Sequence, residues 1–211
     1  MNLKILFFVF SLMTLSSQCY AYLSVGESGE LIKPGQYLVG VEPQVDFTNS
    51  GFNLSAFAGA PYGNDGTLRA KVGFGYVNFE TSIAYKWMPI PDYEKQPAVG
   101  VKVEALYVNK SGASTSGLRF MPLVSKKYDT ENGTFVPYGS IPLNFIFAPT
   151  GNTTGYQIVI GTEYSHPDIA KWTFGGEYGM NIGSSITYIS GIATYYFEEK
   201  DLQNSKLKTK R

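Results

Sequence analysis

Eleven charged residues lie on one face of a series of short stretches in which polar and apolar residues alternate. Successive side chains of a β-strand point to opposite faces, so charges spaced by two residues share a face of the sheet. Charges of both signs on one face can pair with each other, or they can create a field across a narrow channel. These residues are Glu42, Asp46, Arg69, Lys71, Glu80, Lys86, Lys102, Glu104, Arg119, Glu163 and Glu177.

The signs of these charges are segregated along the sequence. Acids dominate the first, eighth and ninth predicted strands, whereas bases dominate the third to the sixth. One interpretation is a lumen plugged by paired charges, because a lone buried charge is very costly. The other is a narrow pore with opposed acidic and basic walls. We favour the plug, because about ten strands enclose little space beyond their own side chains.

The single histidine, His166, stands beside Ser165 and close to Asp168, which are the residue types of a hydrolytic triad. A triad needs groups that converge from different chain segments, whereas neighbouring side chains diverge along a strand, and Pro167 with Asp168 is typical of a turn. The stretch GFGYVN lacks the third glycine of a dinucleotide loop, and no metal-ligand spacing occurs. We therefore predict no catalytic residue, no cofactor and no metal site.

Residues 67–88 have period two on both sides of a glycine turn. If Gly75 and Tyr76 form a two-residue turn, the apolar faces of both halves stay in phase, whereas a slip of one residue would destroy the match. In this register Lys71 lies directly opposite Glu80. The hairpin then has one apolar face and one charged face. The predicted apolar face consists of Leu68, Ala70, Val72, Phe74, Val77, Phe79, Thr81, Ile83, Tyr85 and Trp87.

The same alternation predicts an all-β, antiparallel up-and-down barrel of about ten strands, with eight or twelve as alternatives. Prolines interrupt the pattern at four positions, and each removes a hydrogen-bond donor, which a closed sheet tolerates at bulges or strand ends. They are Pro43, Pro122, Pro137 and Pro142. Outside the hairpin, strands are expected at residues 35–47, 52–60, 99–107, 117–124, 134–147, 156–164, 172–180 and 185–197.

The first 21 residues predict a signal peptide. An unbroken apolar run at residues 5–15 is too short to span a membrane as a permanent helix, and Cys19 and Ala21 are small residues at the positions that a signal peptidase requires. Cleavage is expected after Ala21. Lipoprotein processing at Cys19 is the less favoured alternative, because the preceding residues lack the expected leucine. The mature chain then has no cysteine, which excludes disulfides and thiolate metal sites.

The remaining chain is expected to form one domain, with an N-terminal lead at residues 22–34, a barrel at residues 35–197 and a charged tail at residues 198–211. The formal net charge is zero, and no stretch before the C-terminus is basic, so nothing indicates nucleic-acid binding. Alternation alone fits either a soluble barrel with an apolar interior or a membrane barrel with an apolar exterior.

Three features favour the membrane barrel. The polar face is largely Gly, Ser, Asn and Gln with isolated charges of both signs, which suits a narrow lumen better than a soluble surface. Aromatic residues of the apolar face gather at strand ends, where an interfacial girdle would lie. They are Tyr37, Phe47, Tyr85, Trp87, Tyr107, Tyr164, Trp172 and Tyr178.

Third, the last predicted strand ends on an aromatic residue, with Ile189, Gly191, Ala193, Tyr195 and Phe197 at alternate positions. This strand resembles the C-terminal signal that outer-membrane barrels present to their assembly machinery, although here a charged tail follows it. On these residues the chain resembles the small outer-membrane β-barrel proteins of Gram-negative bacteria. The resemblance implies an outer-membrane location, with the lipid bilayer and the assembly machinery as partners.

The resemblance implies a location more than an activity, because such barrels can be structural, pore-forming, adhesive or enzymatic. We expect a structural or passive pore-type role. A ligand-binding or surface-interaction barrel is the alternative, and a lipid-modifying enzyme is less favoured. With both termini in the periplasm, the short turn at Gly75 would be extracellular and the longer loop at residues 89–97 periplasmic, the reverse of the usual asymmetry.

Overall fold

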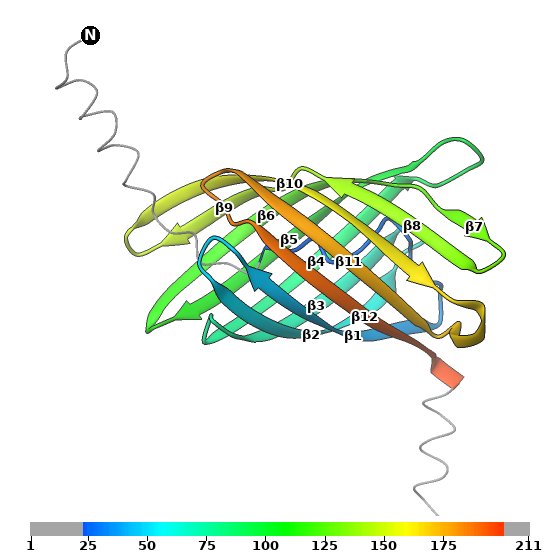
Figure 1. Cartoon of the computed structure of the whole chain (residues 1–211), viewed down its shortest axis with the longest axis horizontal. Helices are drawn as coiled ribbons and strands as arrows, with labels where there is room; N and C mark the ends of the chain where they lie inside the picture. Colours follow the sequence, from blue (N-terminus) through cyan, green and yellow to red (C-terminus); the bar gives the residue numbers. More distant parts are fainter. Residues whose placement is uncertain (1–22, 201–211) are drawn as a thin grey trace, which may run out of the picture.

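The computed structural model describes residues 23–200, which form a closed antiparallel β-barrel (Figure 1). The predicted signal peptide and most of the predicted C-terminal tail lie outside the described residues. No helix in the described range is long and apolar enough to cross a membrane. The strands are β1 (Gln36–Asp46), β2 (Gly51–Tyr62), β3 (Gly66–Gly75), β4 (Phe79–Ile90), β5 (Ala98–Lys110), β6 (Ala113–Ser125), β7 (Tyr128–Thr130), β8 (Gly133–Ser140), β9 (Leu143–Ala148), β10 (Gly151–Ser165), β11 (Trp172–Gly183) and β12 (Tyr188–Glu198), with a short 3-10 helix, η1 (Pro167–Ile169), before β11.

The barrel wall has ten strand positions, although twelve strands are distinguished along the chain. β8 and β9 together occupy one position between β6 and β10, and both keep the same register against each neighbour. β7 only extends a hairpin with β8. Pairing of β1 with β12 and of β10 with β11 closes the circle. The predicted all-β barrel of about ten strands is confirmed.

The prolines sit where a ladder to one neighbour is interrupted. Pairing of β1 with β12 skips Glu42 and Pro43 without a change of register. Pro142 lies in the break between β8 and β9, and Pro122 on β6 lies beside that break, where no pairing with β8 or β9 occurs. Pro137 lies just beyond the last pair of β8 with β6, Ser125 with Tyr138. The single strand predicted at residues 134–147 is therefore two strands.

The register predicted for the hairpin of β3 and β4 is wrong by two residues. Lys71 pairs with Ser82, and Glu80 pairs with Gly73. The connection is the three residues 76–78, and Val77 is only 2% exposed instead of lying on the outer apolar face. A shift by an even number preserves the two faces of each strand, so the assignment of inside and outside survives the error.

Other strand limits also differ from the sequence-based limits. β5 and β6 extend through the predicted polar loop until only residues 111–112 connect them. β10 begins at Gly151, five residues before the predicted start. Strand ends carry weaker alternation than strand centres, which explains these differences.

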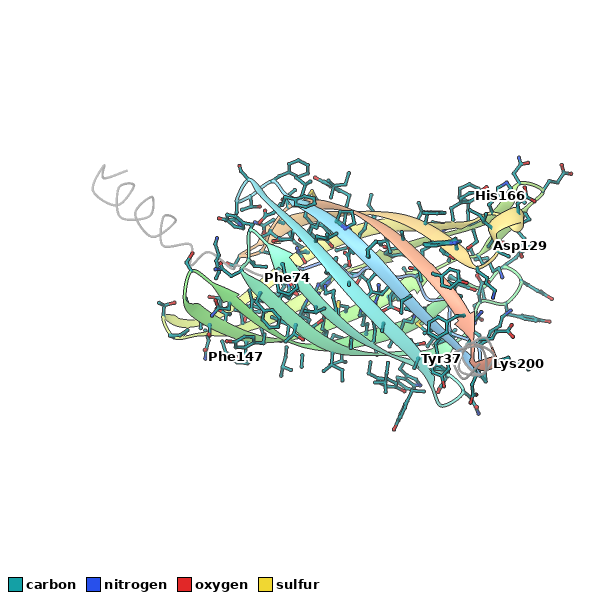
Figure 2. The ribbon with its side chains drawn as sticks, turned by 90° about the horizontal axis from the view of Figure 1, so that it is seen from below. Tyr37, Phe74, Asp129, Phe147, His166 and Lys200 are labelled. Carbon is teal, nitrogen blue, oxygen red and sulfur yellow. The ribbon has the colours of Figure 1, made fainter. Side chains whose placement is uncertain are left out.

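The outer face of the wall is apolar and the inner face is polar. Ile83 and Ile160, for example, are 59% and 60% exposed, whereas Lys86 and Glu104 are buried. Aromatic residues gather at both ends of the barrel, as Figure 2 shows for Tyr37 at one end and for Phe74 and Phe147 toward the other. Ring pairs reinforce these groups, such as Tyr37 stacked on Phe197 and Trp172 tilted against Tyr195.

The predicted N-terminal lead threads the lumen (Figure 1, dark blue). We term the end of the barrel that carries the turns after β1, β3, β5, β9 and β11 the turn end. Leu23 packs there in an apolar cluster with Val77 and Ile186. Ile32 packs with Leu38, Phe57 and Ile192 toward the opposite, terminal end, where β1 begins and β12 finishes. Residues 23–34, here the N-terminal segment, therefore run from the turn end toward the terminal end.

Candidate functional site: a charged lumen and its occupant

The eleven charged residues singled out from the sequence all lie on wall strands, and ten of them are buried in the structure. Glu163 is the exception and is half-buried. Direct ion pairs join members of the set: Lys71 Nζ lies 3.3 Å from Glu80 Oε1, and Arg119 Nη1 lies 2.6 Å from Glu104 Oε2.

Asp46 does not take part in the charge network of the lumen. Its carboxylate accepts hydrogen bonds from the backbone N–H of Thr48 and Asn49 and from Asn49 Nδ2, at 2.7–3.1 Å. Asp46 therefore holds the turn after β1, which is a usual role for aspartate. Glu42 lies beside the N-terminal segment. A Cβ atom added to Gly26 would stand 3.2 Å from Glu42 Oε2.

The carboxylates of Glu163 and Glu177, here the acidic wall, accept hydrogen bonds from the N-terminal segment. Glu177 binds the N–H groups of Val25 and Gly26, each at 2.8 Å, with one oxygen for each. Glu163 binds the N–H of Ser28 at 2.9 Å and its hydroxyl at 2.7 Å. The hydroxyl groups of Tyr138 and Tyr188 also donate to Glu177, which is thus fully surrounded by donors.

The cations on β3 to β6 bind the carbonyl oxygens of the same segment. Arg119 donates to the carbonyls of Leu23 and Ser24 at 2.8 Å, and Lys102 donates to Val25 at 2.7 Å. Further along, Arg69 donates to Gly26, and Lys86 donates to Ser28 and Glu30, at 2.7–2.8 Å. We term Arg69, Lys86, Lys102 and Arg119 the basic wall.

One side chain of the N-terminal segment, Glu27, is the focus of the basic wall. Its carboxylate lies 2.8 Å from both Lys86 Nζ and Lys102 Nζ and 3.5 Å from Arg69 Nη1. Lys86 and Lys102 are directly opposed on β4 and β5. Like charges directly opposite each other destabilise a sheet, and the carboxylate of Glu27 between these two lysines offsets their repulsion.

The sequence-based reasoning missed Glu27 and the segment that carries it. Residues 23–34 show no period of two, because they do not pair as a strand and most of their polar contacts use main-chain atoms. One signal was present in the sequence: bases outnumber acids on the third to the sixth predicted strands, whereas acids dominate the first, eighth and ninth. Gly26 has φ 71°, a backbone conformation that favours glycine, so a larger residue at this position would be strained.

Little space is left between the N-terminal segment and the basic wall. The cavity lined by Val25, Glu42, Arg69, Lys102 and their neighbours holds about 10 Å³. A single water molecule needs at least about 10–15 Å³ on the same measure. This cavity is therefore no larger than a single water molecule.

The histidine neighbourhood forms no triad. Ser165 Oγ shares a hydrogen bond of 2.7 Å with Thr173 Oγ1. His166 Nδ1 accepts from the N–H of Asp168 at the start of η1, a capping role. The two side chains thus serve different parts of the connection between β10 and β11.

A second polar cluster lies outside the barrel wall, in the loop at residues 91–97. Lys126 Nζ donates to the carboxylate of Asp92, and the Lys127 N–H donates to it at 2.6 Å. Desolvation acts to raise the pKa of Asp92, but these two hydrogen bonds and the charges of both lysines hold the pKa below its ordinary value. The cluster ties this loop to the connection after β6.

Comparison with known proteins gave matches among solved structures only. No family model matches the sequence, and no curated protein matches it. A bacterial polysaccharide outer membrane secretin is 12% identical over 79% of this chain and 67% of its own, with a TM-score of 0.47. An outer membrane channel from Pseudomonas putida F1 is 10% identical over 83% of this chain and all of its own, with a TM-score of 0.43. The KdgM porin is 13% identical over 76% of this chain and 99% of its own, with a TM-score of 0.40.

Proposed function

We propose that this protein is an outer-membrane barrel of the passive, pore-type class whose lumen is closed at rest by its own N-terminal segment. The apolar outer face, with aromatic residues at both ends, supports a place in a lipid bilayer. A soluble barrel would present the opposite arrangement, with its apolar side chains inside. Export through the predicted signal peptide and assembly by the outer-membrane machinery belong to the same proposal.

Closure of the lumen rests on one observation, the hydrogen-bonded passage of the N-terminal segment between the acidic and basic walls. The cavity of about 10 Å³ beside it admits no solute. The wall itself is tied by continuous strand pairing, whereas the segment is held by side chains and by three apolar clusters. The segment is therefore the part that can leave without opening the barrel.

Planar-bilayer recordings across a urea series test the closure. We expect no conductance in buffer, discrete reversible steps at moderate urea, and loss of the heat-modifiable barrel band only at higher urea. Conductance steps in buffer without urea, as large as those seen at moderate urea, would mean that the lumen is open at rest. Silence up to the urea concentration that unfolds the barrel would mean that the segment is a permanent part of the core.

Membrane location has a separate test in the substitution Val72→Lys, because Val72 points outward from β3. A lysine on the lipid face costs about 2–4 kcal/mol near the bilayer midplane. We expect the variant to insert poorly into lipid vesicles, whereas Tyr93→Lys, in the loop at residues 91–97, should insert normally. Recovery of the unmodified protein in the soluble periplasmic fraction would refute the proposed location.

A further inference from the structure

A glycine on β8 leaves a depression in the apolar outer face of the barrel. Gly139 lies at an outward position, between Val124 of β6 and Ile160 of β10, which are its pairing partners on the two sides. Val124 is 45% exposed and Ile160 is 60% exposed, so both form ridges beside the glycine. A Cβ atom added to Gly139 would meet no atom closer than 3.7 Å, so neighbouring side chains do not fill the depression.

The depression continues toward the turn end, over the break between β8 and β9. Ile141 in that break and Pro122 on β6 border it there, with Val99 of β5 and Ile158 of β10 on the outer sides. Together these residues line an apolar groove of about 430 Å³, here the outer groove. Sites for small ligands commonly have volumes of about 300–1,000 Å³. The outer groove is therefore large enough for a ligand.

The wall at the outer groove is apolar through its whole thickness. Pro122 and Pro142, on the two sides of the break, have no N–H group that could be left without an acceptor in hydrocarbon. Ser140 also lines the groove, but its hydroxyl oxygen is buried. Behind the groove, the inner face carries an apolar cluster that includes Met121, Leu123, Tyr138 and Val159. The groove thus offers contacts to hydrocarbon and few to polar groups.

Aromatic residues place the outer groove at the depth of lipid chains. Phe135 lies four residues from Gly139 toward the terminal end of β8, and Tyr164 lies four residues from Ile160 on β10. These two residues are paired, and their rings lie 4.6 Å apart. Aromatic girdles of membrane barrels lie at the interface between headgroups and hydrocarbon. The outer groove then lies on the hydrocarbon side of this girdle.

We propose that the outer groove binds one acyl chain of a membrane lipid, whose headgroup stays outside the groove. This inference rests on the proposed place of the barrel in a bilayer.

The width of the outer groove favours a single chain over a second copy of the barrel. Val124 and Ile160 lie on the strands on either side of β8, so the two ridges stand about 10 Å apart. The wall of a second barrel is several strands wide and would rest on the ridges, whereas an unbranched chain can lie between them. A polar ligand would give up hydrogen bonds to water without replacement.

Native mass spectrometry can count the lipids that stay on the barrel. The purified protein is refolded into vesicles of palmitoyl-oleoyl phosphatidylethanolamine and phosphatidylglycerol and is then transferred to a mild detergent. Gly139→Leu fills the depression, and its Cβ makes only ordinary contacts. The matched control is Gly176→Leu on β11, where a Cβ also meets open space, but where the paired residues Thr162 and Gly191 are too small to form ridges.

We expect one retained lipid on the unmodified protein and on Gly176→Leu. Retention by Gly139→Leu should be at least about tenfold weaker, because a chain lifted from the groove loses the burial of several methylene groups. The two headgroups should be retained equally, since the chain is what the groove contacts. The same lipids with hexanoyl chains should be retained weakly.

A second measurement is made in the vesicles, where detergent cannot displace the lipid. A phospholipid with a photoreactive diazirine in one chain should label the peptides that contain Gly139 and Ile141 more strongly than the peptide that contains Ile83, which faces outward from β4. Gly139→Leu should remove this difference and leave the labelling near Ile83 unchanged.

Three results would overturn the inference: equal retention by Gly139→Leu and the unmodified protein, selection of one headgroup over the other, or uniform labelling of the wall with no retained lipid. A dimer that Gly139→Leu dissociates would also overturn it and would assign the groove to a second copy. These outcomes are distinct from those of the fractionation and the bilayer recordings. A membrane-located barrel that opens in urea but retains no lipid keeps the proposed function and loses the lipid site.

Discussion

Substitution of Glu27 by glutamine removes the counter-charge of three buried cations while it preserves the size of the side chain. The carboxylate lies within 2.8 Å of Lys86 and Lys102 and 3.5 Å of Arg69. Removing one partner of a buried ion pair costs about 3–5 kcal/mol. Each cation keeps a carbonyl acceptor on the N-terminal segment, so we expect a value near the lower limit, about 3 kcal/mol.

A loss of about 3 kcal/mol in the closed state alone shifts the ratio of closed to open barrels by roughly 100-fold. The measurement is the open probability of single channels in planar bilayers, together with the urea concentration at which steps first appear. We expect the Glu27→Gln protein to open more often and at lower urea, with little change in the urea concentration that unfolds the barrel itself.

The matched control is Glu30→Gln, in the same segment. The Glu30 carboxylate lies 4.0 Å from Lys127, and the two side chains are about 40% exposed. Exposed ion pairs contribute about 0–1 kcal/mol, so this variant should behave nearly as the unmodified protein does. Equal open probabilities for the two variants would refute the reasoning, because burial of the charge would then have no consequence.

Three further predictions concern the wall and its loops. Glu80→Lys should destabilise the barrel by a few kcal/mol in urea unfolding, because it places a second positive charge beside Lys71. The double variant Lys71→Glu with Glu80→Lys should recover much of this loss. No recovery would mean that the two residues are not coupled. The loop at residues 91–97 should become more sensitive to protease below about pH 4. The pKa of Asp92 is lower in the folded protein than in the unfolded chain, so the stabilisation by its carboxylate is present above the unfolded-state pKa and is lost as the pH falls through the folded-state pKa. The Asp92→Asn variant should be sensitive to protease at every pH. If the terminal end of the barrel faces the periplasm, Ser111→Cys, at the turn end between β5 and β6, should react with an impermeant maleimide on intact cells. Asn132→Cys, at the terminal end between β7 and β8, should then react only after permeabilisation. The opposite pattern would mean that the terminal end faces outward.

The wall of the barrel was predictable because strand alternation is a local property. Each strand shows its two faces within its own sequence, so the inward position of Lys71 and the outward position of Val72 needed no knowledge of neighbouring strands. The register between neighbours was less certain. Lys71 was assigned to Glu80 instead of Ser82, since a shift of two residues leaves the pattern of faces unchanged.

What fills the lumen was decided by the tertiary structure. Backbone N–H and carbonyl groups are the same in every residue type except proline, so a segment bound through its backbone leaves no periodic signal in the sequence. The sequence by itself indicated that acids dominate some strands of the inner face and bases dominate others. Only closure of the barrel set the acidic wall and the basic wall on either side of one segment, with Glu27 among three cations contributed by three different strands.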